Sequence, residues 1–151
     1  VQSRQLSHGE VRLEKLMERL IIIFLRFPTT VGKEIFSNVF SIPASSKFFT
    51  IYENLKRLYN TKQILELPDI RSQFVANNLA NEFDILHLKG EQEFFDYSNT
   101  LAQNEISSLL NQISEESKKD HRQKLAVAIA EAEKRGDRAA VDKLLVEFQE
   151  V

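Results

Sequence analysis

Residues 114–124 contain no apolar side chain, and this polar segment separates two parts of the chain that must each find their own apolar contacts. On either side of it, apolar residues recur every three or four positions, which is typical of an amphipathic helix. No proline or glycine lies between Gly90 and Gly136, so nothing in the sequence forces a helix to stop within the polar segment. A helix this polar either ends or crosses solvent between two packed bodies. We therefore predict a helical bridge, continuous or kinked, over residues 114–124.

The part before the bridge predicts a helical bundle over residues 10–113. A first stripe of apolar residues begins after Glu10 and is ended by Pro28. A short helix through Val39 and Phe40 follows, and Pro43 interrupts the pattern before Ser45 or Ser46 can cap the next helix. Later features of the bundle are Pro68 in the first turn of a helix, a turn at Lys89-Gly90, and a narrow stripe that includes Phe95 and ends at Ile113.

Residues 125–151 predict two short helices joined by a tight turn. Gly136 is expected to stop the first helix in a left-handed conformation, and Asp137 to cap the second. Lys134 and Arg135 precede the glycine and suit the negative end of a helix dipole. The two apolar stripes are formed by Leu125, Ala128, Ile129 and Ala132, and by Val141, Leu144, Leu145 and Phe148. The expected fold is all-α: a helical bundle, a long linking helix and a C-terminal helical hairpin.

This hairpin is smaller than the units that usually fold alone. Val127, Leu144, Val146 and Val151 cannot all turn inward when only two helices pack together. Each large aliphatic side chain left in water forgoes about 1.5–3 kcal/mol of burial. Two arrangements satisfy this constraint: another molecule completes the hairpin, or the hairpin folds back onto the bundle, and the pattern alone does not separate them.

The chain shows no set of residues that predicts catalysis. It has no cysteine, which excludes a disulfide, a thiolate zinc site and a cysteine nucleophile. His8, His87 and His121 are far apart in sequence, whereas a metal site needs three or four converging ligands. The carboxylates are spaced as helix-surface charges, and the four glycines stand singly, so no phosphate-binding loop is present. We expect a non-catalytic fragment without metal or cofactor.

Charge and hydropathy limit the possible partners. The longest apolar run, Leu20–Leu25, is far too short to span a membrane, and the first residues do not resemble a signal peptide, so we expect no membrane partner and a cytoplasmic location. The net charge is −2, which argues against a nucleic-acid-binding polycation. Arg12, Lys15 and Arg19 could still line one face of the first helix, but glutamates are interleaved with them. The chain lacks an initiator methionine, and we interpret it as a piece of a larger protein.

The end of the sequence, Ile129 to Val151, resembles the C-terminal hairpin of bacterial DNA primases. That family commonly ends with a helix, a Gly-Asp turn and a helix that bears Leu-Leu and Phe-Gln, here Gly136-Asp137, Leu144-Leu145 and Phe148-Gln149. The segment from Leu16 to Pro28 is similar to the opening helix of the same domain, with Phe27 where the family often has histidine. Residues 31–113 match only in the number and length of helices.

The resemblance implies a helicase-binding domain, which docks on the N-terminal domain of the replicative helicase and couples primer synthesis to the replication fork. The chain would be a monomer alone, its bundle would modulate the helicase, and the zinc-binding and RNA-synthesising regions of the primase would lie upstream. Two alternatives stay open: the N-terminal domain of a replicative helicase, whose hairpin would self-associate, and a helical nucleic-acid-binding domain. The docking residues that the resemblance implies are Lys134, Arg135, Arg138, Leu144, Phe148 and Gln149.

Overall fold

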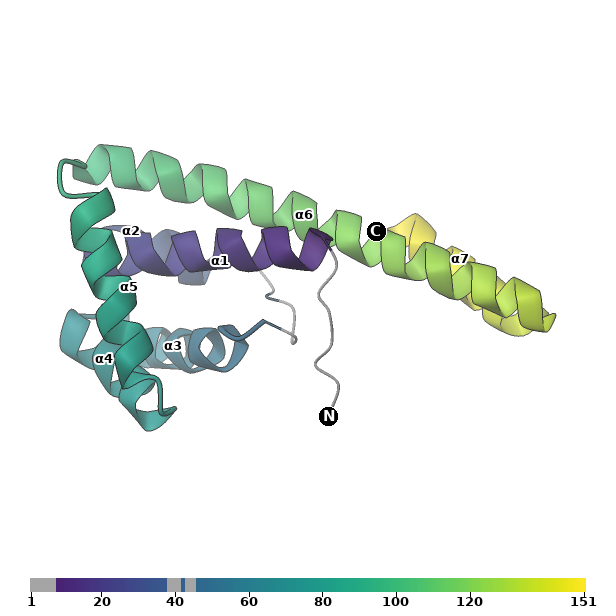
Figure 1. The fold of residues 1–151 in the computed structure, drawn as a ribbon, viewed down its shortest axis with the longest axis horizontal. Coiled ribbons are helices and arrows are strands. Elements are labelled where there is room, and N and C mark those ends of the chain that lie inside the picture. Colours follow the sequence, from purple (N-terminus) through teal and green to yellow (C-terminus); the bar gives the residue numbers. More distant parts are fainter. Residues whose placement is uncertain (1–7, 38–41, 43–45) are drawn as a thin grey trace. The chain divides into compact units, whose positions relative to one another are not determined.

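A computed structural model describes residues 8–37, 42 and 46–151, and within these ranges every regular element is an α-helix. The predicted all-α class is therefore confirmed. The expectations placed on Val39, Phe40, Pro43 and Ser45 fall outside the described residues. The helices are α1 (His8–Arg26), α2 (Pro28–Ser37), α3 (Phe49–Lys62), α4 (Leu67–Ala76), α5 (Ala80–Glu93), α6 (Asn99–Arg135) and α7 (Arg138–Glu150) (Figure 1).

Contacts between residues divide the chain into two compact units. The larger unit is Glu14–Ile113, and the smaller unit combines Val1–Leu13 with Ser114–Val151. Helices α1 and α6 each contribute residues to both units. The first turns of α1 and the polar segment 114–124 thus group with the hairpin residues 125–151, and the larger unit begins at Glu14 rather than at Glu10.

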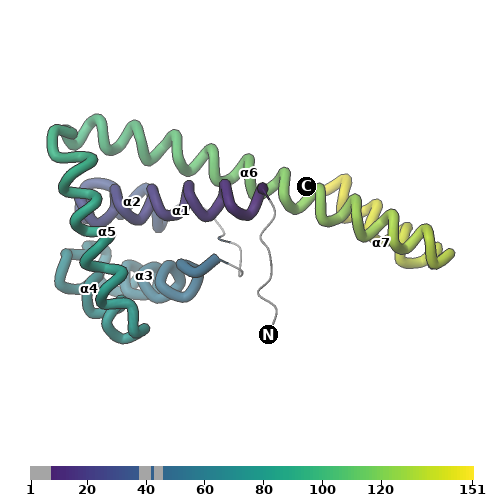
Figure 2. The backbone as a smooth tube through the Cα atoms, viewed as in Figure 1, coloured from purple at the N-terminus to yellow at the C-terminus, as the bar shows by residue number. Residues whose placement is uncertain are grey.

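Helix α1 lies at the centre of the larger unit. All residues from Leu20 to Leu25 are at most 4% exposed, which requires neighbours on every side of the helix. Helix α6 runs beside it, with the Arg19 guanidinium of α1 bonded to the Glu105 carboxylate of α6 (Figure 2). Helix α2 reaches α6 through Thr30 and Asn99. Helices α3, α4 and α5 pack in succession, α3 on α4 and α4 on α5.

Two helix boundaries follow directly from proline and asparagine. Helix α1 ends at Arg26, two residues before Pro28. Pro28 is the first residue of α2, where its missing N–H costs no hydrogen bond. Residues 70–83, which show only loosely spaced apolar positions, form two helices rather than one. Asn78 takes a left-handed conformation (φ 59°) between α4 and α5, a backbone state that asparagine tolerates better than most residues.

The turn predicted at Lys89-Gly90 is wrong, because Gly90 lies inside α5 and is buried. A Cβ atom at this position would lie 3.0 Å from the carbonyl oxygen of Ile22 and 3.5 Å from Cβ of Arg26, both in α1. The glycine is therefore required by close packing of α5 on α1, not by a change of chain direction.

The expected place of Phe95 in the apolar stripe is also wrong. Phe95 is 72% exposed, whereas its neighbour Phe94 is 1% exposed and contacts the Tyr97 ring edge-on at 4.8 Å between centroids. Helix α5 ends at Glu93 and α6 begins at Asn99, so both phenylalanines lie in the connection and not on a helical stripe. The helical period therefore does not apply to them.

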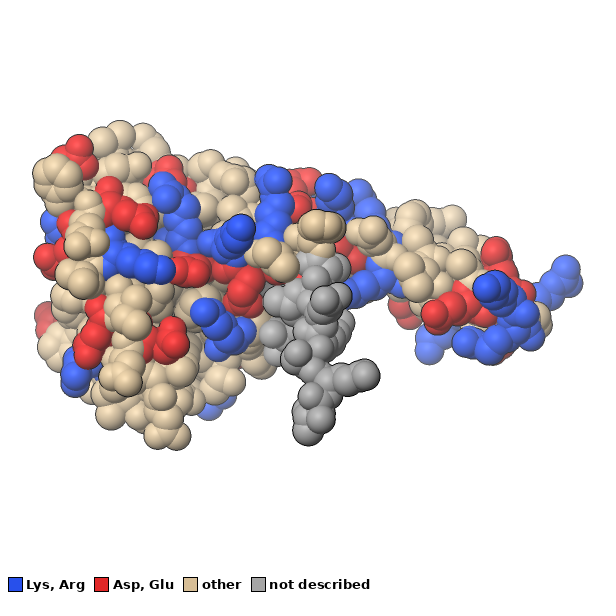
Figure 3. Space-filling model, viewed as in Figure 1, with Lys and Arg blue, Asp and Glu red and all other residues tan. Residues whose placement is uncertain are grey.

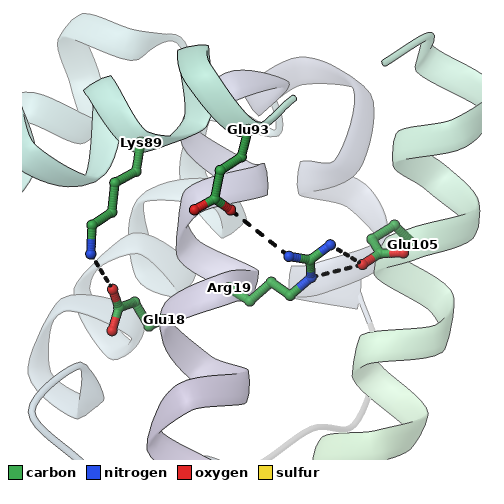
Figure 4. A network of polar contacts seen from close by, with 5 residues as sticks. All are labelled: Glu18, Arg19, Lys89, Glu93 and Glu105. Carbon is green, nitrogen blue, oxygen red and sulfur yellow. Dashed lines mark hydrogen bonds and ion pairs between the residues drawn. The ribbon is translucent and has the colours of Figure 1, made fainter. Parts of the chain in front are cut away.

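Ion pairs join α1 to the helices beside it (Figure 4). Both Nε and Nη2 of Arg19 lie within 2.8 Å of Glu105 Oε1, and Nη1 lies 3.9 Å from Glu93 Oε2. Lys89 Nζ of α5 lies 2.9 Å from Glu18 Oε1, and this hydrogen bond raises the pKa of Lys89. All these side chains are partly exposed, so solvent screens the charges and the pairs add little to the stability of the fold. Their main effect is to fix which faces of the helices meet.

The close approach at Gly90 can be tested with two glycine substitutions. We expect Gly90→Ala to lower the free energy of unfolding by about 1–2 kcal/mol, because overpacking against Ile22 outweighs the gain in helix propensity. Gly32→Ala in α2 is the matched control, since its Cβ would meet Phe24 at an ordinary 3.7 Å. That variant should gain about 0.5–1 kcal/mol from the lower backbone entropy of alanine. Urea unfolding followed by circular dichroism measures both; equal effects of the two substitutions would contradict the packing argument.

Candidate functional site

The turn between α6 and α7 is specified by two residues, as predicted. Gly136 has φ +69°, and the carbonyl groups at the end of α6 are satisfied from within the turn: Gly136 N–H donates to Glu133 O and Asp137 N–H to Ala132 O, each at 3.0 Å. This pair of bonds is the Schellman motif. The Asp137 carboxylate then accepts a hydrogen bond from Ala140 N–H at 3.1 Å and caps α7. The local sequence at Gly136 and Asp137 therefore specifies the reversal of chain direction between α6 and α7.

Helix α7 returns along the second half of α6 (Figures 1 and 2). Arg122 Nη2, in α6, donates to the carbonyl oxygen of Val151 at 2.8 Å, so the last residue reaches the level of residue 122. The two helices form a hairpin whose turn lies at one end and whose Arg122–Val151 contact lies at the other.

The hairpin buries few of its apolar residues. Leu125 and Ala132 of α6 are 6% and 0% exposed, but α7 has no buried residue. Leu144 is half-buried and represents the inward side of α7. The exposed large apolar side chains of the hairpin are Val127 (56%), Leu145 (43%), Val146 (56%) and Phe148 (38%).

The six residues that the family resemblance implies for docking fall into two groups. Leu144 and Phe148 lie on neighbouring turns of α7, half-buried and 38% exposed respectively, so Phe148 both packs and presents part of its ring. The other four residues, Lys134, Arg135, Arg138 and Gln149, are exposed.

The three cations of this set gather around the turn. Lys134 and Arg135 belong to the last turn of α6, and Arg138 to the first turn of α7, at the end of the hairpin where charged side chains are visible in Figure 3. In the described part of the chain, no carboxylate lies within ion-pair distance of them. A cation in the first turn of a helix opposes the helix dipole, so Arg138 does not stabilise α7 through that field.

Leu145 is an exposed residue that the sequence pattern did not single out, because it was counted with the inward stripe. It follows Val141 by four positions and precedes Phe148 by three, so it occupies the edge of the same face. The spacing of apolar residues shows which face of a helix is apolar. It does not show how much of that face a neighbouring helix covers, and α6 leaves part of the apolar face of α7 exposed. Of the four residues that were not expected all to turn inward, Val127 and Val146 are both 56% exposed, and Leu144 and Val151 are half-buried.

The polar segment 114–124 is an uninterrupted part of α6, but it is not surrounded by solvent. Arg12 Nε of α1 lies 3.3 Å from Glu116 Oε1. Lys124 Nζ lies 3.7 Å from Glu10 Oε1 and 2.9 Å from Asp120 Oδ2. Charged side chains of residues 114–124 thus make polar contacts with the first turns of α1. Residue spacing within one helix could not predict these contacts, because the partners lie in another helix.

Other kinds of site receive no support from the described residues. Among them, no group of three or more His, Asp or Glu side chains is arranged to hold a metal ion. None of the described helices combines the length and the hydropathy that a membrane-crossing segment requires.

Comparison of the chain with known protein families, with curated proteins and with solved structures finds no match in any of the three.

The cap of α7 gives a prediction about the hairpin itself. Asp137→Ala should raise hydrogen exchange of the amides in the first turn of α7, because Ala140 N–H loses its acceptor, and should cost about 1 kcal/mol of local stability. Asp142→Ala, in the same helix but beyond its first turn, is the matched control. Hydrogen exchange read by NMR measures the effect; equal protection in the two variants would show that the cap does not order α7.

Proposed function

We propose that this chain is a protein-docking domain of the kind that ends bacterial DNA primases, and that its α6–α7 hairpin binds the N-terminal domain of the replicative helicase. The observation that carries the proposal is that α7 buries none of its residues while Leu145, Val146 and Phe148 remain exposed. Three large apolar side chains on a helix of 13 residues are poorly explained by the fold of the chain alone.

The sequence resemblance gives the identity of the partner in this proposal. The Gly136-Asp137 turn and the Leu144-Leu145 and Phe148-Gln149 pairs are the features shared with the primase hairpin. An amphipathic helix that presents residues at positions i, i+3 and i+4 is a common way to dock on a helical partner. Val141, Leu145 and Phe148 stand at positions i, i+4 and i+7 of one helical face, and the exposed cations at the turn would form a polar rim.

In this proposal the chain takes no part in RNA synthesis. Its role is to hold the primase on the helicase at the replication fork, in the bacterial cytoplasm, and the larger unit would influence the activity of the helicase. A primase needs such contact because primers must be made where the helicase exposes single-stranded DNA.

The proposal is tested by titrating the chain with a bacterial replicative helicase hexamer. The double variant Leu145→Ser/Phe148→Ser should weaken binding about 30-fold or more, because buried aromatic and aliphatic anchors dominate the energy of such interfaces. Ile64→Ser, at a residue 63% exposed in the larger unit, is the matched control and should bind as the unchanged chain does. Isothermal titration calorimetry gives the affinities, and circular dichroism verifies that each variant is folded.

Other outcomes would favour the alternatives. Unchanged affinity in the double variant would place the interface outside α7. Self-association of the chain in sedimentation, lost in the double variant, would favour the N-terminal domain of a helicase. Binding to single-stranded DNA that falls steeply with salt, without binding to the helicase, would favour a nucleic-acid-binding domain.

A further inference from the structure

Helix α5 has apolar side chains on two opposite sides. Its inner side contributes Phe83, Leu86 and Gly90 to the core of the larger unit. On its outer side, Ile85 and Leu88 are 53% and 58% exposed. A helix that is apolar on both sides is normally covered on both.

The outer residues form a stripe along the helix axis. With about 100° per residue, Ile85 and Leu88 point within about 60° of each other. Asn81, four positions before Ile85, and Gln92, four positions after Leu88, fall within the same arc and are exposed. The outer stripe therefore has an apolar centre and uncharged polar ends, and it extends over roughly 16 Å, about three helical turns. This is the length over which a partner helix could make contacts.

Acidic side chains lie on both sides of this outer stripe. Helix α5 contains four carboxylates and one lysine. Lys89 is bonded to Glu18 of α1, so its charge is compensated within the larger unit. Figure 3 shows uncharged side chains over α5 with both acidic and basic side chains beside them. The carboxylates of α5 are those of Glu82, Asp84, Glu91 and Glu93.

Two of these carboxylates have partners within the larger unit. Glu93 lies 3.9 Å from Arg19, and Glu91 lies 3.6 Å from His87, which is a cation only when protonated. Asp84 is exposed and has no cation within ion-pair distance among the described residues. The outer side of α5 thus presents an uncharged stripe with an apolar centre and with carboxylates on both flanks, of which Asp84 has no cation beside it among the described residues.

We propose that the outer side of α5, centred on Ile85 and Leu88, docks a basic amphipathic helix of a second protein. The partner would place leucine, isoleucine or valine at positions i, i+3 and i+4 against the apolar centre, with lysine or arginine on both flanks. Charge complementarity selects this occupant. A second copy of α5 would bring carboxylates against carboxylates, and an anionic membrane surface would be repelled for the same reason.

This surface is distinct from the hairpin in sequence and in chemistry. It belongs to the larger unit, whereas α7 belongs to the smaller one. The hairpin turn carries the exposed cations Lys134, Arg135 and Arg138, whereas α5 has a single lysine, which is bonded to Glu18. The two proposals can therefore fail independently.

The test uses the whole chain, labelled with ¹⁵N, and a synthetic amphipathic peptide of about five helical turns with leucine on one face and lysine on the flanks. Amide signals of α5 should shift on titration. In fluorescence anisotropy, Ile85→Gln/Leu88→Gln should weaken binding about tenfold or more. Ile64→Gln, a large apolar residue 63% exposed elsewhere on the larger unit, is the matched control and should bind unchanged.

The charge requirement is tested separately. Asp84→Asn/Glu91→Gln should weaken binding several-fold and reduce its dependence on salt. A peptide with glutamate in place of lysine should bind at least about tenfold more weakly, with the same apolar face. Circular dichroism should show unchanged helix content in all variants, because every substituted side chain is exposed.

Several results would overturn the proposal. These are the absence of shifts in α5 of the unchanged chain, shifts confined to α7, and equal binding of the basic and acidic peptides. Self-association that Leu88→Gln abolishes would identify the occupant as a second copy of the chain, against the proposal. Because the NMR titration uses the unchanged chain, a folding defect in a variant cannot hide the answer.

Discussion

The architecture of the larger unit depends on the need to cover α1 on all sides. Most helices of small proteins bury one stripe and expose the other, but residues 20–25 of α1 are all buried, whichever way their side chains point. Helix α6 runs along one side of α1, and α5 approaches it so closely that a Cβ atom at position 90 would lie only 3.0 Å from the carbonyl oxygen of Ile22. The ion pairs of Arg19 and Glu18 then fix these neighbours in one register, although they contribute little stability themselves.

The hairpin differs, since the backbone hydrogen bonds of its turn set its direction and only a few apolar side chains, among them Leu125 and Ala132, are buried in it. Gly136 and Asp137 satisfy the hydrogen-bonding groups at the end of α6 and the beginning of α7. The direction of α7 is thereby fixed within two residues, and no buried side chain of α7 is needed to fix it. A helix that is ordered in this way can leave apolar side chains exposed, as α7 does with Leu145 and Phe148.

The sequence predicted those features that depend on neighbours along the chain. The all-α class, the break in the chain's first helical stripe at Pro28 and the turn at Gly136-Asp137 all follow from spacing and local hydrogen bonding. The sequence did not predict features that depend on contacts with an element far away along the chain. Gly90 predicts a turn when taken alone, and only the nearness of Ile22 shows that it is a packing residue. In the candidate site, the pattern identified the stripe of α7 but could not tell how much of it α6 would cover, which is why Leu145 was not expected to be exposed.

The burial of α1 has a consequence for synthesis on the ribosome. Its apolar side chains emerge early, whereas the part of α6 that covers them, up to Ile113, is made roughly 90 residues later, a delay of about 5–18 s at ordinary elongation rates. During that interval the Leu20–Leu25 run lacks the cover that α6 provides in the complete unit. The larger unit therefore cannot complete its fold until the chain has been synthesised at least as far as Ile113.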